Sequence, residues 1–280
     1  MPELPEIEVL RRDLERDLVG RKIKSVEVDG LKPIRRHRTK KAFTGLLDGH
    51  KITGVERRGR YLLIRLDGPD VLLVDLGPTG SLVRAKTART AVTKGTHVVI
   101  TFTQGGQLRY SDPKVTGEMF VTPLEGIADE VSEIAAKGLD PLEASISWID
   151  FGRLIAGRHA KLKALLMDAS VLTGIGPVYS DEILFAAGLR WDRESDSLTD
   201  QEIRRLYRAI VETVQEAVKY AGSRAANNSD GDGVDHTGSG ENHRFKVYER
   251  EGEACRRCRR PLVKLRVGNR PVFFCEACQV

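Results

Sequence analysis

The four cysteines of this 280-residue chain form two Cys-x-x-Cys pairs near its C-terminal end, Cys255 with Cys258 and Cys275 with Cys278. A tight turn brings the thiolates of residues i and i+3 together, so two such pairs can hold one tetrahedral Zn²⁺ around a hairpin. Two disulfides are the alternative, but they need an oxidising compartment, and the N-terminus lacks the apolar run of a secretory signal. We therefore expect one structural zinc ion per chain and a cytoplasmic protein.

Positive charge is concentrated around these cysteines. From Arg244 to the end, ten Lys and Arg stand against four Glu, a net charge of +6 in a chain whose total is +5. A basic patch on a small metal-bound module favours a polyanion such as nucleic acid as partner, with a merely solvated surface as the alternative. The sequence contains no apolar stretch long enough to span a bilayer, so we expect no membrane contact. We expect a monomer.

Periodicity divides the rest of the chain into a β-rich part and a helical part. Apolar residues at helical spacing predict a helix over residues 6–18. Short β-rich runs between Gly and Asp residues predict an antiparallel sandwich or barrel. These runs cover residues 22–28, 51–57, 61–66, 71–76, 97–103, 107–110 and 118–121. Helical periods follow at residues 148–157, 162–167, 180–187 and 199–221, the last with a capping box from Thr199 to Glu202.

The expected fold class is therefore α+β with several domains. An N-terminal antiparallel β-sandwich with an N-terminal helix occupies residues 1–130, and a helical domain occupies residues 131–223. Residues 224–243 are rich in Gly, Ser, Asn and Asp and are expected to form a flexible loop. A zinc finger with a β-hairpin occupies residues 244–280.

The first six residues suggest a nucleophile. Removal of Met1 would leave Pro2 as a free secondary amine, and an α-amino group titrates near pH ~8, so part of it is nucleophilic at neutral pH. Attack of this amine on a sugar C1′ would give a cationic iminium, which accepts electrons in later eliminations. Glu3 could shuttle protons and Glu6 could orient the amine. The alternative is an ordinary proline-rich start with acidic residues at the beginning of a helix.

Six blocks in order along the chain decide between these alternatives. They are Pro-Glu-Leu-Pro-Glu at residues 2–6, Arg-Arg-Gly-Arg-Tyr-Leu-Leu at 57–63, Leu-Gly-Pro-Thr-Gly-Ser-Leu at 76–82, Arg-Tyr-Ser-Asp-Pro at 109–113, Gly-Ile-Gly-Pro-Val-Tyr-Ser-Asp-Glu at 174–182, and the zinc hairpin. Together they resemble the formamidopyrimidine-DNA glycosylase / endonuclease VIII family of base-excision repair enzymes over essentially the whole chain. The resemblance implies a DNA glycosylase with abasic-site lyase activity, a helix–two-turn–helix domain and a nucleoid-associated location.

The resemblance also implies roles for individual residues. Pro2 would displace the damaged base and form a Schiff base with C1′ of a flipped-out nucleotide, with Glu3 as its acid–base partner. The expected catalytic residues are Pro2, Glu3, Glu6, Arg60 and Arg270. The expected DNA-binding residues are Arg109, Lys114, Lys163, Gly174, Gly176 and Arg270, of which the two glycines would form a phosphate-binding turn before a helix.

Several positions depart from the family pattern. Arg60 replaces a lysine, Asp75 a histidine, and Pro177 the asparagine of the phosphate-binding turn. In the family, a methionine fills the hole left by an extruded base, and an arginine and a phenylalanine wedge into the duplex; here Pro78 replaces the methionine, and Val115 and Thr116 replace the other two. Filling that hole offsets an unstacking cost of a few kcal/mol. We therefore expect a preference for abasic, single-stranded or otherwise distorted DNA.

Two other functions remain open at this point. One is a catalytically weak or inactive paralogue that binds damaged DNA without excising a base, and the altered positions are compatible with it. The other is a zinc-ribbon transcription or RNA-binding module, which leaves the N-terminal block unexplained. The intact Pro2, Glu3 and Glu6 favour the enzyme.

Overall fold

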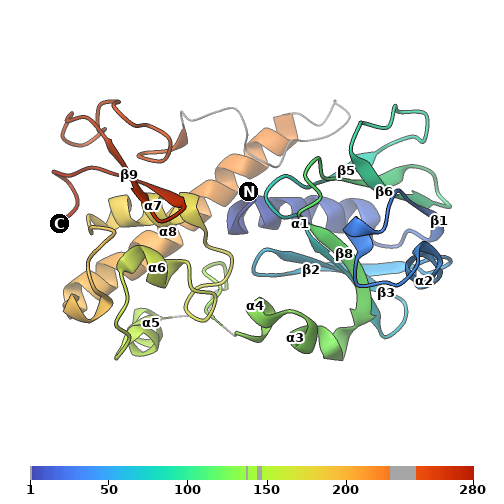
Figure 1. Cartoon of the computed structure of the whole chain (residues 1–280), viewed down its shortest axis with the longest axis horizontal. Coiled ribbons are helices and arrows are strands. Elements are labelled where there is room, and N and C mark those ends of the chain that lie inside the picture. The colour runs from blue at the N-terminus through green and yellow to red at the C-terminus, as the bar shows by residue number, and fades with distance from the viewer. Residues whose placement is uncertain (1, 137, 144–146, 228–243) are drawn as a thin grey trace. The chain divides into compact units, whose positions relative to one another are not determined.

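The computed structural model describes residues 2–136, 138–143, 147–227 and 244–280, with side chains to residue 223 in the last helix before the gap. The chain divides into two compact units. The first comprises Met1–Ser132 and Val218–Ser239, and the second Glu133–Ala217 and Gly240–Val280. Each unit is described by itself below (Figure 1).

The first unit is built on two antiparallel four-stranded sheets preceded by the helix α1 (Leu4–Leu18). One sheet has the strand order β1-β6-β7-β5 and the other β2-β3-β4-β8. The strands are β1 (Ile23–Val28), β2 (Ile52–Arg58), β3 (Tyr61–Leu66), β4 (Asp70–Asp75), β5 (Ser81–Ala85), β6 (Thr96–Phe102), β7 (Gln107–Ser111) and β8 (Glu118–Pro123). The α+β class, with an N-terminal helix and antiparallel sheets, is confirmed.

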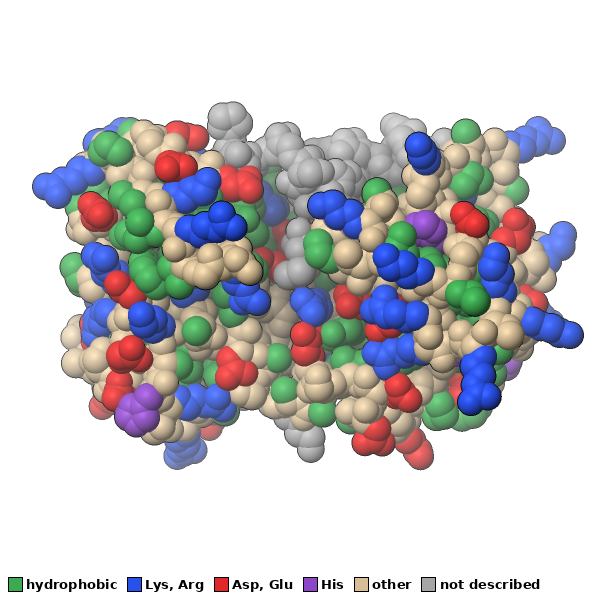
Figure 2. All heavy atoms as spheres, in the orientation of Figure 1, with side chains coloured by type: hydrophobic (Ala, Val, Ile, Leu, Met, Phe, Trp, Pro, Cys, Tyr) green, Lys and Arg blue, Asp and Glu red, His purple; other side chains and the backbone are tan. Residues whose placement is uncertain are grey.

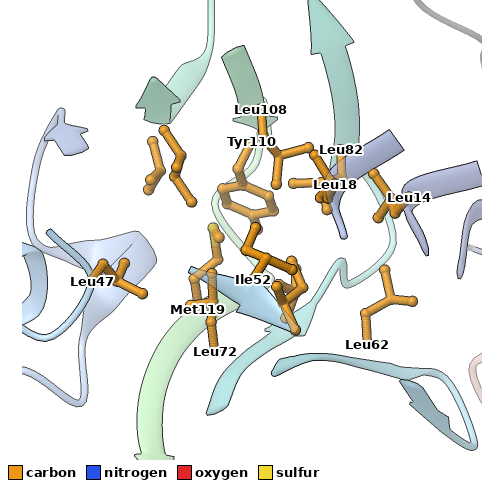
Figure 3. Close-up of a cluster of buried hydrophobic side chains, with 14 of the residues drawn as sticks. Leu14, Leu18, Leu47, Ile52, Leu62, Leu72, Leu82, Leu108, Tyr110 and Met119 are labelled. Carbon is orange, nitrogen blue, oxygen red and sulfur yellow. The ribbon is translucent and has the colours of Figure 1, made fainter. Parts of the chain in front are cut away.

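One hydrophobic core holds this unit together, and it draws side chains from α1 and from both sheets (Figure 3). Leu14 and Leu18 extend from α1, Leu108 and Tyr110 from β7, and Met119 from β8, all at most 3% exposed. The helical and alternating spacings of the sequence place these side chains on inward faces. Each fully buried side chain of this kind stabilises the fold by roughly 1.5–3 kcal/mol.

Among the described residues of the second unit, the four helices that the sequence predicts are followed by a two-stranded hairpin. The helices are α5 (Trp148–Ile155), α6 (Leu162–Leu166), α7 (Pro177–Ala187) and α8 (Asp200–Asn227). Only the part of α8 up to Ala217 belongs to this unit. The hairpin consists of β9 (Val263–Val267) and β10 (Arg270–Phe274). The predicted capping box at the start of α8 is present, because Glu202 accepts hydrogen bonds from the Thr199 backbone N–H and hydroxyl. Within the described residues, no helix has the length and apolar character needed to cross a membrane.

Sequence periodicity missed several short elements. They are β5, the helices α2 (Lys40–Gly45), α3 (Ile127–Glu130) and α4 (Ser132–Ala135), and the 3₁₀ turns η1 (Lys32–Ile34), η2 (Leu124–Gly126) and η3 (Ser195–Ser197). The 3₁₀ turns and the helices α3 and α4 have only three or four residues, which is too short to establish a helical period. The prediction of a loop from residue 224 was wrong for residues 224–227, where α8 continues to Asn227. The rest of that predicted loop, residues 228–243, lies outside the described residues.

Candidate active site and zinc centre

The N-terminus of α1 brings Pro2, Glu3 and Glu6 together. Glu3 is the N-cap residue of α1, and the Glu6 carboxylate accepts a hydrogen bond from the Glu3 backbone N–H at 3.0 Å. Pro2 is buried, and Glu3 and Glu6 are 2% and 6% exposed. Pro2 is a tertiary amide as long as Met1 remains attached, so it becomes a nucleophile only after Met1 is removed. Glu3 directly follows this proline in the chain, and Glu6 is bonded to the Glu3 backbone N–H.

Glu8, one turn further along α1, is a functional candidate that sequence reasoning missed. Its carboxylate accepts hydrogen bonds from Arg11 at 3.1 Å, Arg12 at 2.7 Å and Arg57 at 3.0 Å. Burial by itself would raise the pKa of Glu8, but the hydrogen bonds from these guanidinium groups outweigh burial and lower the pKa to about 2. Two of the three partners, Arg11 and Arg12, stand at helical spacing from Glu8, so the sequence did carry a signal for part of this cluster.

Arg57 connects this cluster to the turn that carries Arg60. The Arg57 guanidinium donates to the Gly59 carbonyl at 3.2 Å, and Gly59 has a φ of 57°, a conformation that favours glycine. Arg60 is half-buried, and its guanidinium lies 5.7 Å from the centre of the Tyr61 ring. The predicted role of Arg60 in catalysis stays a prediction.

Asp112 organises the loop between β7 and β8. It is fully buried and accepts hydrogen bonds from the backbone N–H groups of Thr116 at 2.7 Å and Gly117 at 2.9 Å, and from the Thr79 hydroxyl. Burial would raise the pKa of Asp112, but these hydrogen bonds lower it below its ordinary value. The loop that carries Lys114, Val115 and Thr116 is thereby tied to the loop that carries Pro78 and Thr79.

The two predicted DNA contacts in this region differ in exposure. Lys114 is exposed on the loop. Arg109 is 5% exposed, and its guanidinium donates to the Gln107 side chain and to the carbonyls of Thr90 and Ala91. Arg109 therefore holds the segment before β6 in this structure, and its contact with DNA stays a prediction.

In the second unit, Gly174 and Gly176 lie directly before α7. Gly174 has a φ of 74°, and Gly176 is the N-cap residue, with Pro177 in the first turn. Proline fits there because the first N–H groups of a helix have no intrahelical acceptor. Lys163 is 6% exposed, and its ammonium group donates to Asp181. Burial raises the pKa of Asp181 to about 6, although Lys163 and the Phe273 backbone N–H act in the opposite direction.

The four cysteines converge at the base of the β9–β10 hairpin, with all four sulfur atoms within 4.8 Å of one another. The Cys258–Cys275 and Cys255–Cys278 sulfur atoms are 3.4 Å and 3.9 Å apart. Disulfide sulfurs would be about 2.0 Å apart, whereas four thiolates around zinc at about 2.3 Å lie about 3.8 Å from one another. The cluster therefore fits one structural zinc ion, as predicted, and not two disulfides.

Not all basic residues of the zinc finger are free to bind a polyanion. Arg257 donates to the carbonyls of Phe185 and Ala186 at 2.7 Å and 3.0 Å, and so caps the C-terminal end of α7. Arg256, Arg259 and Arg270 are exposed. On the face drawn in Figure 2, the Lys and Arg side chains of each unit lie among Asp and Glu side chains. On this face, positive charge is therefore not gathered into one uniform patch.

Comparison with known proteins places these features in one family. Residues 1–119 match the formamidopyrimidine-DNA glycosylase N-terminal domain, residues 138–229 its H2TH domain, and residues 252–280 a zinc finger found in FPG and IleRS. The formamidopyrimidine-DNA glycosylase of Pelotomaculum thermopropionicum is 36% identical over 100% of this chain and 99% of its own length. That of Geobacillus kaustophilus is 37% identical, with 100% of both chains covered.

Solved structures agree with this assignment. The complex of the Lactococcus lactis Fpg with DNA that contains an abasic site matches with a TM-score of 0.87 and 28% identity, over 99% of both chains. A complex of the Lactococcus lactis protein with Fapy-dG-containing DNA matches with a TM-score of 0.84 and 27% identity, over 99% of both chains. The full-length matches exclude a zinc-ribbon module as the explanation of the whole chain. The chain belongs to the formamidopyrimidine-DNA glycosylase family.

Proposed function

We propose that this protein is a base-excision repair DNA glycosylase with abasic-site lyase activity. The observation that carries the proposal is the full-length match to formamidopyrimidine-DNA glycosylases together with the intact Pro2, Glu3 and Glu6. Relatives solved with abasic-site DNA support DNA as the partner. The intact acidic residues disfavour an inactive damage-binding paralogue. The proposal also includes a cytoplasmic, nucleoid-associated location and a monomeric state. It keeps the four segments expected from the sequence: β-sandwich, helical domain, loop and zinc finger.

The proposed reaction begins at Pro2. The amine of Pro2 attacks C1′ of the damaged nucleotide, a nitrogen–carbon bond forms, and the glycosidic bond breaks as the base leaves with its electron pair. The C1′–O4′ bond then breaks as O4′ takes a proton from Glu3, which opens the sugar ring and gives an iminium between Pro2 and C1′. Loss of a C2′ proton then expels the 3′ phosphate, and a second elimination expels the 5′ phosphate. Glu6 keeps the chain terminus in place through its bond to the Glu3 backbone N–H at 3.0 Å.

The basic residues would hold the phosphates during these eliminations. Arg270 and Arg60 are proposed as phosphate ligands, because a guanidinium group can donate two parallel hydrogen bonds to phosphate oxygens. Lys114 and the turn of Gly174 and Gly176 are proposed as further DNA contacts, and the exposure of Lys114 supports its part.

We also propose that the enzyme favours abasic, single-stranded or distorted DNA. Pro78, Val115 and Thr116 are smaller than the residues that fill the extrusion hole in the family pattern. Asp112 anchors the Thr116 N–H at 2.7 Å, which limits how far this loop can move to compensate. No side chain would then offset the unstacking cost of a few kcal/mol when a base is extruded from an intact duplex.

Borohydride trapping tests the proposed chemistry. Incubation with abasic-site DNA and borohydride is expected to give a covalent protein–DNA adduct, because reduction converts the iminium into a stable amine. Mass spectrometry of the protein should show that Met1 is absent. Pro2→Gly is expected to lose most of the adduct, whereas Glu15→Gln, an exposed substitution on the same helix, should trap as the wild type does. Absence of an adduct in the processed wild-type protein would overturn the proposal.

A further inference from the structure

A buried lysine–aspartate pair links three elements of the second unit. Lys163 in α6 is 6% exposed and Asp181 in α7 is 1% exposed. The Lys163 ammonium donates to Oδ1 of Asp181 and, at 3.2 Å, to the carbonyl oxygen of Pro177 in the first turn of α7. The other carboxylate oxygen, Oδ2, accepts the backbone N–H of Phe273 at 3.0 Å. One carboxylate therefore connects α6 and α7 to the strand β10.

The strand that Asp181 holds is the one that presents Arg270. Arg270 opens β10 and is exposed, whereas Val272, Phe273 and Phe274 at the other end of the strand are buried. Phe273 lies three residues from Arg270, about 10 Å along an extended chain. Because β10 is also paired to β9 from Arg270 to Phe274, a fixed Phe273 fixes the base of the hairpin from which Arg270 extends.

A second carboxylate on α7 ties down the chain before the zinc finger. Glu182, next to Asp181, accepts the backbone N–H groups of Lys246, Val247 and Tyr248 at 2.8–2.9 Å. The side chain of Phe185, one turn further on, packs in the same core as Cys255 and Cys275. The helix α7 therefore carries the attachment points of the zinc finger, and the proposed phosphate-binding turn lies directly before its first residue.

The position of Lys163 does not suit a phosphate ligand. Lysines that bind phosphate keep the ammonium group at the surface, where the long side chain can reach solvent. Here the ammonium group is neutralised internally by Asp181 and bonded to the Pro177 carbonyl. Exposing it to phosphate would leave the carboxylate of Asp181 buried without its counter-ion, which is strongly unfavourable.

We propose that Lys163 is a positioning residue. With Asp181, it sets the place of the zinc hairpin, and so of Arg270, relative to the Gly174–Pro177 turn, and it does not itself bind phosphate. The inference rests on the proposed function in DNA binding, and it revises the expectation that Lys163 contacts DNA directly.

Chemical labelling of lysines tests the position of Lys163 in the unmodified protein. Reductive methylation followed by mass spectrometry is expected to leave Lys163 unreacted both with and without an abasic-analogue duplex. Lys161 is exposed two residues earlier and should react readily in the free protein. Reaction of Lys163 at the rate of Lys161 in the free protein, with protection only on DNA, would overturn the proposal.

A double-mutant cycle tests the mechanism. Lys163→Met and Asp181→Asn each leave one member of the pair alone, and we expect each to weaken binding of a tetrahydrofuran-containing duplex by roughly tenfold or more. The double variant removes both charges, and its Asn still offers an acceptor to Phe273. It should bind the duplex more tightly than either single variant. The slope of log K against log salt concentration should equal that of the wild type.

The salt slope separates the two roles of Lys163. A lost phosphate contact reduces the slope by about 0.9, and a slope reduced by this amount in the double variant, without recovery of affinity, would overturn the proposal. If either single variant fails to fold, the double variant decides alone, and if the double variant also fails, the labelling result decides. If the wild type does not bind the duplex, the proposed function fails; labelling and amide exchange of Phe273 in the wild type then decide whether the pair holds β10.

Discussion

Glu8 shows how a buried carboxylate can stay charged in this protein. Its side chain is 9% exposed, so water solvates it poorly, and isolated burial would favour the neutral form. Guanidinium groups of Arg11, Arg12 and Arg57 replace the lost water and lower the pKa of Glu8 to about 2. The ion pair of Glu8 and Arg57 joins α1, which directly follows the proposed nucleophile Pro2, to the turn with Arg60. Glu8 therefore serves both stability and the geometry of the candidate active site.

The pH dependence of unfolding should report this cluster. The folded pKa of Glu8 is lowered from 4.5 to about 2, so its contribution to stability is complete above pH 4.5 and is lost as the pH falls to about 2. The contribution is about 3 kcal/mol by the linkage relation. Glu8→Gln should therefore lower the free energy of unfolding at pH 7 by about this amount, measured by urea denaturation.

A matched substitution serves as control for Glu8. Glu15→Gln removes a carboxylate on the same helix that is 50% exposed and also pairs with Arg11. An exposed pair of this kind contributes about 0.5 kcal/mol, so little change is expected. Equal losses for the two variants, or a pH dependence between pH 2 and 4.5 that Glu8→Gln leaves intact, would contradict the account.

Val115 carries backbone strain in the loop that Asp112 anchors. Its φ is 50°, in the left-handed region that a β-branched residue rarely adopts. Val115→Gly should therefore be more stable than Val115→Ala by about 1 kcal/mol, the reverse of the usual order of these two residues. Thermal unfolding of the two variants measures the difference. An Ala variant more stable than the Gly variant would show that the loop relaxes and stores no strain.

At the scale of elements, α7 stabilises the zinc finger, whose own apolar core is small. The finger has a small apolar cluster, and its chain is held by carboxylates and carbonyls of α7. The Glu182 carboxylate accepts hydrogen bonds from three backbone N–H groups of the segment before the finger. The Arg257 guanidinium donates two hydrogen bonds to carbonyls at the C-terminal end of α7. A small metal-bound module needs such external support.

Zinc release measures this support. Glu182→Ala leaves three backbone N–H groups without their acceptor, at a cost of about 2–3 kcal/mol, and should speed transfer of Zn²⁺ to a chromogenic chelator at least about tenfold. Glu216→Ala is the control, because Glu216 is 68% exposed and, among the residues that the structure describes, pairs with the Lys246 side chain at 3.4 Å. Equal rates of zinc release from Glu182→Ala and the wild type would show that α7 does not stabilise the zinc finger through Glu182.

At the scale of the whole molecule, the residues proposed for sugar chemistry and those at the proposed extrusion hole come from different segments. Pro2 and Glu3 directly precede α1 and Glu6 lies in its first turn, whereas Val115 and Thr116 lie on the β7–β8 loop. These segments can therefore change independently in evolution. Under the proposed function, such separation lets a chain keep the residues proposed for sugar chemistry while the positions of the proposed extrusion hole vary.

Strand preference tests this separation. The wild type should cleave 8-oxoguanine in single-stranded DNA at least as fast as the same lesion opposite cytosine in a duplex. Val115→Arg combined with Thr116→Phe should raise duplex cleavage relative to single-strand cleavage by roughly tenfold, because the larger side chains offset unstacking. Val92→Arg adds the same charge at a position that is 57% exposed and should leave the ratio unchanged. A strong duplex preference in the wild type would refute the proposal.

The sequence by itself determined the elements with a long period and the groups with a fixed spacing. The helix α1, seven of the eight strands of the two sheets and the zinc ligands followed from residues that lie close together in the chain. Local spacing also carried the family resemblance, because each block is a contiguous stretch.

Only the tertiary structure decided what the long-range partners of these residues are. Arg57 reaches Glu8 across 49 positions, and Phe273 reaches Asp181 across 92, so no local pattern could reveal either contact. The burial of the Lys163 and Arg109 side chains could not be predicted from the sequence either. A charged side chain is buried only when distant groups compensate its charge. Spacing along the chain specifies local geometry, whereas burial and ion pairing depend on which distant segments the fold brings into contact.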